Sequence, residues 1–211
     1  MAPSQPPRAA SSAATRHAPW DDGARRRLET LLVDFATRSP PVRVVPKRAY
    51  WHQRAAATAL RVVTLGGQDR YLSDYVTTLG RTIYVHDDWD EQPPGRRWEV
   101  LRHEAVHVRQ FERWGWLVMI LVYGILPLPL GLANGRARLE WEAYAETLRA
   151  VAELEGLEAA KSPALHDEIV RRFTGPDYGW RWPFEGAVRR WIAEEVARIE
   201  GGHGATRRAP A

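Results

Sequence analysis

Two histidines separated by three residues form the clearest chemical motif of this sequence. His103, Glu104 and His107 make up the pattern His-Glu-x-x-His. On a helix, residues four apart lie on one face about one turn apart, so both imidazoles can bind a single zinc ion. The carboxylate of Glu104 would lie beside the metal and could take a proton from a metal-bound water. The motif therefore predicts that two metal ligands and a general base come from one helical turn.

The residues around this motif favour a continuous buried helix. Apolar residues precede and follow the motif, and neither proline nor glycine occurs from Arg96 to Trp114. The competing interpretation is a surface amphipathic helix that carries two solvated histidines. The apolar neighbours favour the buried helix.

A zinc ion held with one position open for water needs a third protein ligand. A second long helix is expected from Gly135 to about Glu158, and it offers three carboxylates, Glu140, Glu142 and Glu146. Residues two apart on a helix point about 200° away from each other, so Glu140 and Glu142 cannot both face one ion. Helical spacing alone leaves the choice among the three open.

Together, the two segments resemble the zincin metallopeptidases. In the gluzincin branch of these enzymes, the third ligand comes from a helix with the pattern Glu-x-x-Ala/Ser-Asp. Residues 140–144, Glu-Trp-Glu-Ala-Tyr, match this pattern with Tyr144 in place of the aspartate. The match implies that Glu140 is the third zinc ligand and that Tyr144, on the same helix face, is a hydrogen-bond partner in the site. Starting the pattern at Glu142 keeps an acid, Glu146, at the last position, so these two glutamates remain alternative ligands.

The chain is also similar to a group of small bacterial metallopeptidases, mostly uncharacterised, with His-Glu-x-x-His-x-x-Gln followed by Glu-x-Glu-Ala-Tyr or Glu-x-Glu-Ala-Asp. This resemblance covers about Thr82 to Leu148 and is carried by two short motifs. It implies a zinc-dependent peptidase that acts on a peptide or protein substrate. Glu104 would be the general base that activates water for hydrolysis of the peptide bond.

Short runs of β-branched and aromatic residues upstream of the motif predict a small antiparallel sheet. The expected strands are 42–45, 59–65, 71–78 and 81–86. The last two, joined around Leu79-Gly80-Arg81, are expected to form a hairpin. In zincins, a strand at this place pairs with the extended substrate, so the resemblance implies that Thr82, Ile83, Tyr84 and Val85 form the substrate edge strand. The alternative is an ordinary sheet strand.

An uncharged apolar segment separates the two ligand helices. It runs from Trp114 to Gly135 and is long enough to span a bilayer. A full span would put His107 and Glu140 on opposite sides of a membrane about 30 Å thick, too far apart to share one ion. Prolines and glycines near its middle favour a hairpin at 114–135 that turns back. This hairpin would be buried in the protein or would enter a membrane interface.

The composition of the chain excludes several other sites and functions. The 211 residues are 45% hydrophobic and 27% charged, which is typical of one globular domain. There is no cysteine, so disulfides and thiolate metal sites are excluded, and a reducing compartment is favoured. The net charge of +4 comes from scattered arginines without a basic block, so no nucleic-acid partner is expected.

The two ends of the chain are expected to be disordered tails. Residues 1–20 are rich in proline, alanine and serine and contain no apolar run that could form a signal-peptide core. Residues 201–211 are rich in glycine and arginine. A single domain would then cover 21–200. Without a signal peptide, a cytoplasmic location is expected, with peripheral membrane association as the alternative.

These observations predict an α+β, zincin-like fold. A small antiparallel sheet would be followed by the His-Glu-x-x-His helix, the apolar hairpin and the second ligand-bearing helix. The predicted function is zinc-dependent hydrolysis of peptide bonds. The alternative is a non-catalytic membrane-interface or scaffolding protein with a degenerate zincin site. Arg109, at a position where zincins prefer a hydrophobic residue, and Tyr144 keep this alternative open.

Overall fold

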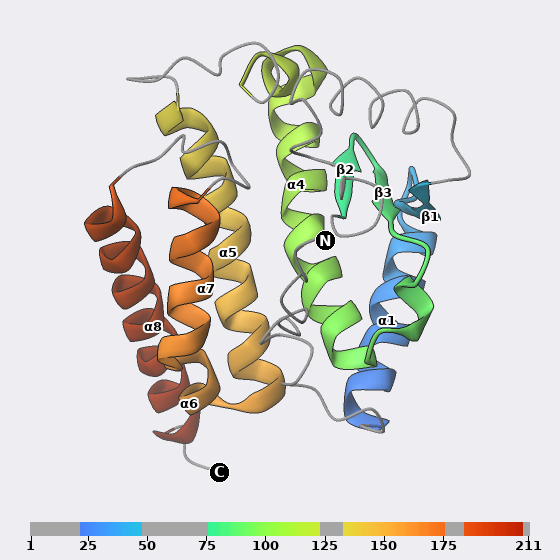
Figure 1. The fold of residues 1–211 in the computed structure, drawn as a ribbon. Helices are drawn as coiled ribbons and strands as arrows, with labels where there is room; N and C mark the ends of the chain where they lie inside the picture. Colours follow the sequence, from blue (N-terminus) through green and yellow to red (C-terminus); the bar gives the residue numbers. More distant parts are fainter. Residues whose placement is uncertain (1–21, 48–75, 123–132, 176–183, 209–211) are drawn as a thin grey trace, which may run out of the picture.

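The computed structural model describes residues 22–47, 76–122, 133–175 and 184–208 of the chain. Its elements, labelled as in Figure 1, are α1 (Asp22–Thr37), β1 (Arg43–Pro46), β2 (Thr77–Leu79), β3 (Thr82–Val85), the short 3-10 helix η2 (Trp89–Glu91), α4 (Pro94–Ile120), α5 (Ala133–Glu155), α6 (Leu157–Ala160), α7 (Pro163–Thr174) and α8 (Glu185–Arg208). The described chain is mostly helical with one small sheet, so the predicted α+β class is confirmed at this level.

The described sheet has three strands in the order β1-β3-β2. β1 runs parallel to β3, and β2 runs antiparallel to it as the other arm of a hairpin. Gly80 forms the tight turn of this hairpin with a φ of 61°, a conformation that glycine adopts without strain. The hairpin around Leu79-Gly80-Arg81 is therefore confirmed, although the sheet is mixed and not purely antiparallel.

The position predicted for Thr82–Val85 within this sheet is wrong. These residues form β3, which pairs with β1 on one side and with β2 on the other, so β3 is the central strand of the described sheet. The physical reason is that β3 already pairs in parallel with Arg43–Pro46. The backbone groups on that side of β3 therefore cannot pair with a substrate. The predicted strand at 59–65 and most of the one at 71–78 lie outside the described residues.

α4 and α5 lie side by side at the centre of the molecule (Figure 1). Leu101 and Val108 of α4 are buried in one apolar core with α1 and the sheet. Leu148 and Val151 of α5 belong to a second core with α6, α7 and α8. Ala150 of α5 belongs to the core of α4 as well, so apolar packing also joins the two helices directly.

The structure also corrects the expected C-terminal tail. α8 continues through Gly201 and Gly202 to Arg208, so these residues are helical and not an unstructured tail. Glycine has a low helix propensity, but extending an existing helix adds one hydrogen bond per residue without a new nucleation cost. The predicted tail at 1–20 lies outside the described residues.

Candidate metal centre

Three side chains converge between α4 and α5. One ligand atom from each of His103, His107 and Glu140 lies within 4.8 Å of the others. Nε2 of His107 is 3.8 Å from Oε2 of Glu140, and the two imidazole rings have their centroids 5.1 Å apart. Two donors on a tetrahedral zinc ion with bonds of about 2 Å lie about 3.3 Å apart, so small side-chain rotations would bring this set onto one ion.

Local sequence explains why these residues share one place. α4 begins at Pro94, whose fixed φ suits the first turn of a helix, and it continues without a break through the motif. His103 and His107 are four residues apart and therefore lie on one face. Glu140 comes from α5, which lies alongside α4.

A hydrogen-bond chain fixes the tautomer of His107. Nδ1 of this imidazole is 2.9 Å from Oε1 of Gln110, while Nε2 of Gln110 donates to the carbonyl of Leu139 and to Oε2 of Glu142, each at 2.9 Å. A carbonyl oxygen and an ionised carboxylate can only accept hydrogen bonds. The amide nitrogen of Gln110 must therefore face Leu139 and Glu142, and its amide oxygen must face His107. The imidazole therefore donates from Nδ1, and its Nε2 keeps the lone pair that a metal needs.

His103 is oriented in the same way by Thr147. Nδ1 of His103 is 3.0 Å from Oγ1 of Thr147, and this hydroxyl donates its own proton to the carbonyl of Ala143 at 3.3 Å. The hydroxyl oxygen is thus left to accept from Nδ1, so Nε2 of His103 is also the free ligand atom. Burial lowers the pKa of His103 well below its ordinary value, and nearby positive groups lower it further. A neutral imidazole is the form that binds a metal.

Glu104 is buried next to the three candidate ligands and is held by the sheet. Its Oε2 accepts a hydrogen bond of 2.7 Å from Oγ1 of Thr78 on β2. Burial raises the pKa of Glu104, an effect opposed by His107 and by the hydrogen bond from Thr78. A carboxylate with a raised pKa is a stronger proton acceptor than an exposed one. Thr78 was not singled out in the sequence, because nothing in its spacing relates it to the motif.

Lys47 is a second residue that the sequence did not reveal. It follows β1 and is fully buried, although lysine is among the residues least often buried. Burial lowers its pKa to about 8, and the negative charge of Glu104 acts in the opposite direction. Lys47 thus provides a buried positive charge that interacts with the candidate base. Nothing in the sequence around Lys47 predicts that this lysine is buried.

The aromatic ring of Tyr144 lies at the same site. It packs edge-on against His103 with centroids 4.9 Å apart, and its other side contacts Phe173 of α7 at 5.3 Å. Tyr144 thus lies beside a candidate metal ligand. Its role as a hydrogen-bond partner stays a prediction.

The two alternative ligands have other partners. Glu142 is exposed and accepts the hydrogen bond from Gln110. Glu146 forms an ion pair with Arg102. Because positions 142 and 146 are rotated about 200° and about 240° from position 140 around the helix, neither joins the two histidines when Glu140 does. Among the described residues, Glu140 is the carboxylate that the structure groups with the histidine pair.

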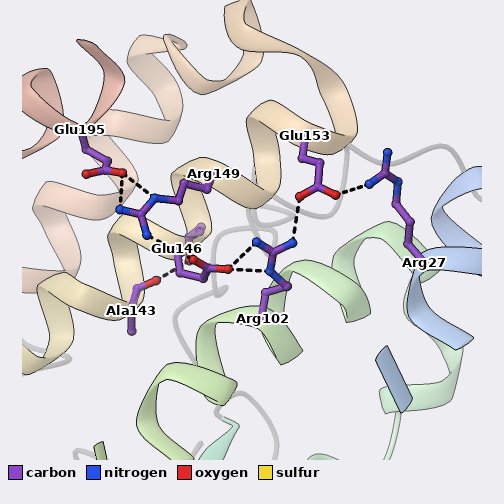
Figure 2. Close-up of polar contacts among 8 residues, drawn as sticks. Arg27, Arg102, Ala143, Glu146, Arg149, Glu153 and Glu195 are labelled. Carbon is purple, nitrogen blue, oxygen red and sulfur yellow. Dashed lines mark hydrogen bonds and ion pairs between the residues drawn. The ribbon is translucent and has the colours of Figure 1, made fainter. Parts of the chain in front are cut away.

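A chain of ion pairs fixes the relative position of the two ligand helices (Figure 2). Arg102, next to His103, forms two contacts with Glu146, one of them from Nε at 2.6 Å, and reaches Glu153 at 2.9 Å. The chain comprises Arg27, Glu153, Arg102, Glu146, Arg149 and Glu195, and it joins α1, α4, α5 and α8. Two nitrogens of Arg102 reach the same oxygen, Oε1 of Glu146, and these charge-assisted hydrogen bonds resist sliding of α5 along α4.

Comparison with protein families, with curated proteins and with solved structures found no match to this chain.

Proposed function

We propose that this protein is a zinc-dependent peptidase of zincin type, in which His103, His107 and Glu140 hold the metal and Glu104 is the general base. The observation that supports this proposal most directly is the grouping of these two histidines with a carboxylate from a separate helix. Two imidazoles and one carboxylate, with no cysteine in the chain, suit zinc and leave a position for water.

Each residue around the site has a part in this proposal. A bound zinc ion would supply Lewis acidity, which lowers the pKa of water towards 7 and polarises the carbonyl group of a substrate. Glu104 takes a proton from the attacking water and passes it to the leaving amine. Thr78 holds one oxygen of Glu104, so the other oxygen can face the reacting water. Gln110 and Thr147 orient the two imidazoles.

The edge of the sheet beside Glu104 suits an extended substrate. β2 is the outer strand next to β3 in the described sheet, and its Thr78 contacts Glu104 directly. A peptide that paired with β2 would extend the sheet by main-chain hydrogen bonds and would pass close to the candidate base. This role for β2 replaces the one expected of Thr82–Val85.

The Glu104→Gln variant tests the proposed reaction. It keeps the shape of the side chain and its hydrogen-bonding oxygen but removes the base, so we expect normal metal content and loss of peptide hydrolysis by at least about 10³-fold. A peptide library with a fluorescence readout measures the rate without knowledge of the sequence preference. Glu194→Gln, at an exposed position on α8 outside the site, is the control and should retain at least about a third of the activity. Equal hydrolysis by Glu104→Gln and the parent would contradict the mechanism.

The alternative, a non-catalytic membrane-interface or scaffolding protein with a degenerate site, is favoured by one observation. Large apolar side chains are exposed at the end of α4. If the zinc-loaded protein cleaves no member of the library while it binds metal normally, this alternative replaces the peptidase proposal.

A further inference from the structure

Exposed apolar side chains gather at the C-terminal end of α4. In the described part of the chain, the large apolar side chains with high exposure there are Trp114, Trp116, Leu117, Val118 and Leu121, which we call the apolar tip. Leu117 is 73% exposed and Trp116 is 54% exposed. Elsewhere in the described residues, only Val33 and Phe184 are comparable, and these lie singly, Val33 on α1 and Phe184 just before α8. A contiguous exposed apolar patch marks an interaction surface, whereas scattered exposed residues do not.

The apolar tip is a distinct structural unit. Gly115 has φ 74° and ψ 167°, so the helical geometry of α4 is interrupted there and a separate helical turn begins at Trp116. The ring of Trp116 packs against Phe111, and an added Cβ on Gly80 would lie only 3.2 Å from this ring. The tip is thus anchored to α4 and to the β2–β3 turn while its outer surface stays exposed. None of the helices in the described residues combines the length and apolar character needed to cross a membrane.

Positive side chains surround the tip. Arg109 and Arg113 are exposed on the last turns before Gly115, and the guanidinium of Arg113 lies 5.0 Å from the ring centroid of Trp114. The start of α5 lies beside the tip, because an added Cβ on Gly135 would lie 3.8 Å from Val122, and the exposed Arg138 follows one turn later. The nearby acid, Glu112, pairs with Arg81 at 3.3 Å.

We propose that the apolar tip docks this protein on the surface of an anionic lipid bilayer. Along the chain, arginines are followed by tryptophans and then by aliphatic side chains, an order that matches the headgroups, the interface and the acyl chains of a bilayer. A second copy of the chain fits less well, since docking two tips would bring their arginines together. The proposal does not depend on peptidase activity, because the tip is separate from the metal ligands.

Flotation of the full chain with lipid vesicles tests the proposal. We expect binding to vesicles that contain phosphatidylglycerol in phosphatidylcholine, and binding at least about tenfold weaker to phosphatidylcholine alone. Leu117→Asp combined with Leu121→Asp should reduce binding at least about tenfold, because both charges would enter the apolar layer. Val33→Asp and Phe184→Asp are matched controls from other exposed apolar positions and should bind like the parent. Thermal unfolding by circular dichroism checks that each variant folds.

A second pair of variants tests the role of charge without altering the apolar surface. Arg109→Glu with Arg113→Glu should lose the preference for anionic vesicles, and binding of the parent should weaken as salt is raised. The proposal is overturned if the parent fails to float with anionic vesicles, or if the tip variants bind as well as the parent. It is also overturned if the tip variants instead convert a dimer of the parent into a monomer in light scattering, because the tip would then be a contact between copies.

Discussion

Gln110 connects the two ligand helices: its Oε1 accepts a hydrogen bond from Nδ1 of His107, and its Nε2 donates to the carbonyl of Leu139, the residue before Glu140. One amide thus orients a ligand on α4 and fixes the backbone beside a ligand on α5. A side chain with this double role should control metal affinity more than stability.

Replacing Gln110 by leucine should weaken zinc binding. The variant keeps the side-chain volume but removes all three hydrogen bonds, to His107, Leu139 and Glu142, and loss of such a partner typically costs about 10- to 100-fold in metal affinity. Competition with a chromogenic chelator measures the dissociation constant. Gln110→Glu keeps an acceptor for His107 but sets a carboxylate oxygen against the carbonyl of Leu139 and against Glu142, so it should weaken zinc binding as well. An unchanged affinity in Gln110→Leu would show that the hydrogen bonds do not position the ligands.

The ion pair between Arg102 and Glu146 should stabilise the fold measurably. Both side chains are largely buried, and Arg102 is shared with Glu153, so a double-mutant cycle with Arg102→Met and Glu146→Gln should give a coupling free energy of about 1–2 kcal/mol. The exposed pair Arg189 and Glu185 on α8 is the control, for which a much weaker coupling is expected. Urea unfolding of the single and double variants gives both values. Equal coupling in the two pairs would argue against a structural role for the network.

The buried Lys47 should make stability depend on pH in the alkaline range. Its pKa is lowered from 10.5 to about 8 in the folded state, so between these values the unfolded chain binds more protons than the folded one. The free energy of unfolding contributed by Lys47 therefore rises from pH 8 towards pH 10.5. Each pKa unit corresponds to about 1.4 kcal/mol, so between pH 7 and 10 the parent should gain roughly 2–3 kcal/mol relative to Lys47→Met. Urea unfolding with a chelator present measures this difference, and parallel pH curves for the two proteins would contradict it.

Gly80 should tolerate no side chain. Its φ of 61° strains any other residue, and a Cβ would approach Trp116 to 3.2 Å, so Gly80→Ala should destabilise the protein by about 1–3 kcal/mol. Gly186 in the first turn of α8 has open space around it, and Gly186→Ala should be neutral or stabilise by up to about 1 kcal/mol. Thermal unfolding compares the two. A neutral Gly80→Ala would mean that the turn and Trp116 adjust at little cost.

The ligand helices could be predicted from the sequence because their signals are local. Four-residue spacing places His103 and His107 on one face wherever the helix forms, and helical rotation separates Glu140 from Glu142. The choice of Glu140 required a family pattern as well, since spacing alone does not say which face of α5 meets α4.

The remaining features depend on contacts between distant segments. β1 and β3 are short strands far apart in the sequence, and their parallel pairing leaves no periodic signal in either one. The burial of Lys47 follows from this pairing, as does the central position of Thr82–Val85. The sequence did not predict that residues 201–208 are helical. Glycine has a low helix propensity, and this propensity takes no account of the helix that already precedes these residues.

Metal content of the purified protein tests the central proposal most directly. We expect about one zinc ion per chain by elemental analysis after expression with added zinc and gel filtration, because two imidazoles and a carboxylate form a three-ligand site. His103→Ala and Glu140→Ala should each retain less than about a tenth of this zinc, whereas Glu142→Ala, in which the carbonyl of Leu139 still holds Gln110, should retain most of it. A parent protein free of transition metal, or a Glu140→Ala variant as fully loaded as the parent, would contradict the metal centre and the peptidase proposed from it.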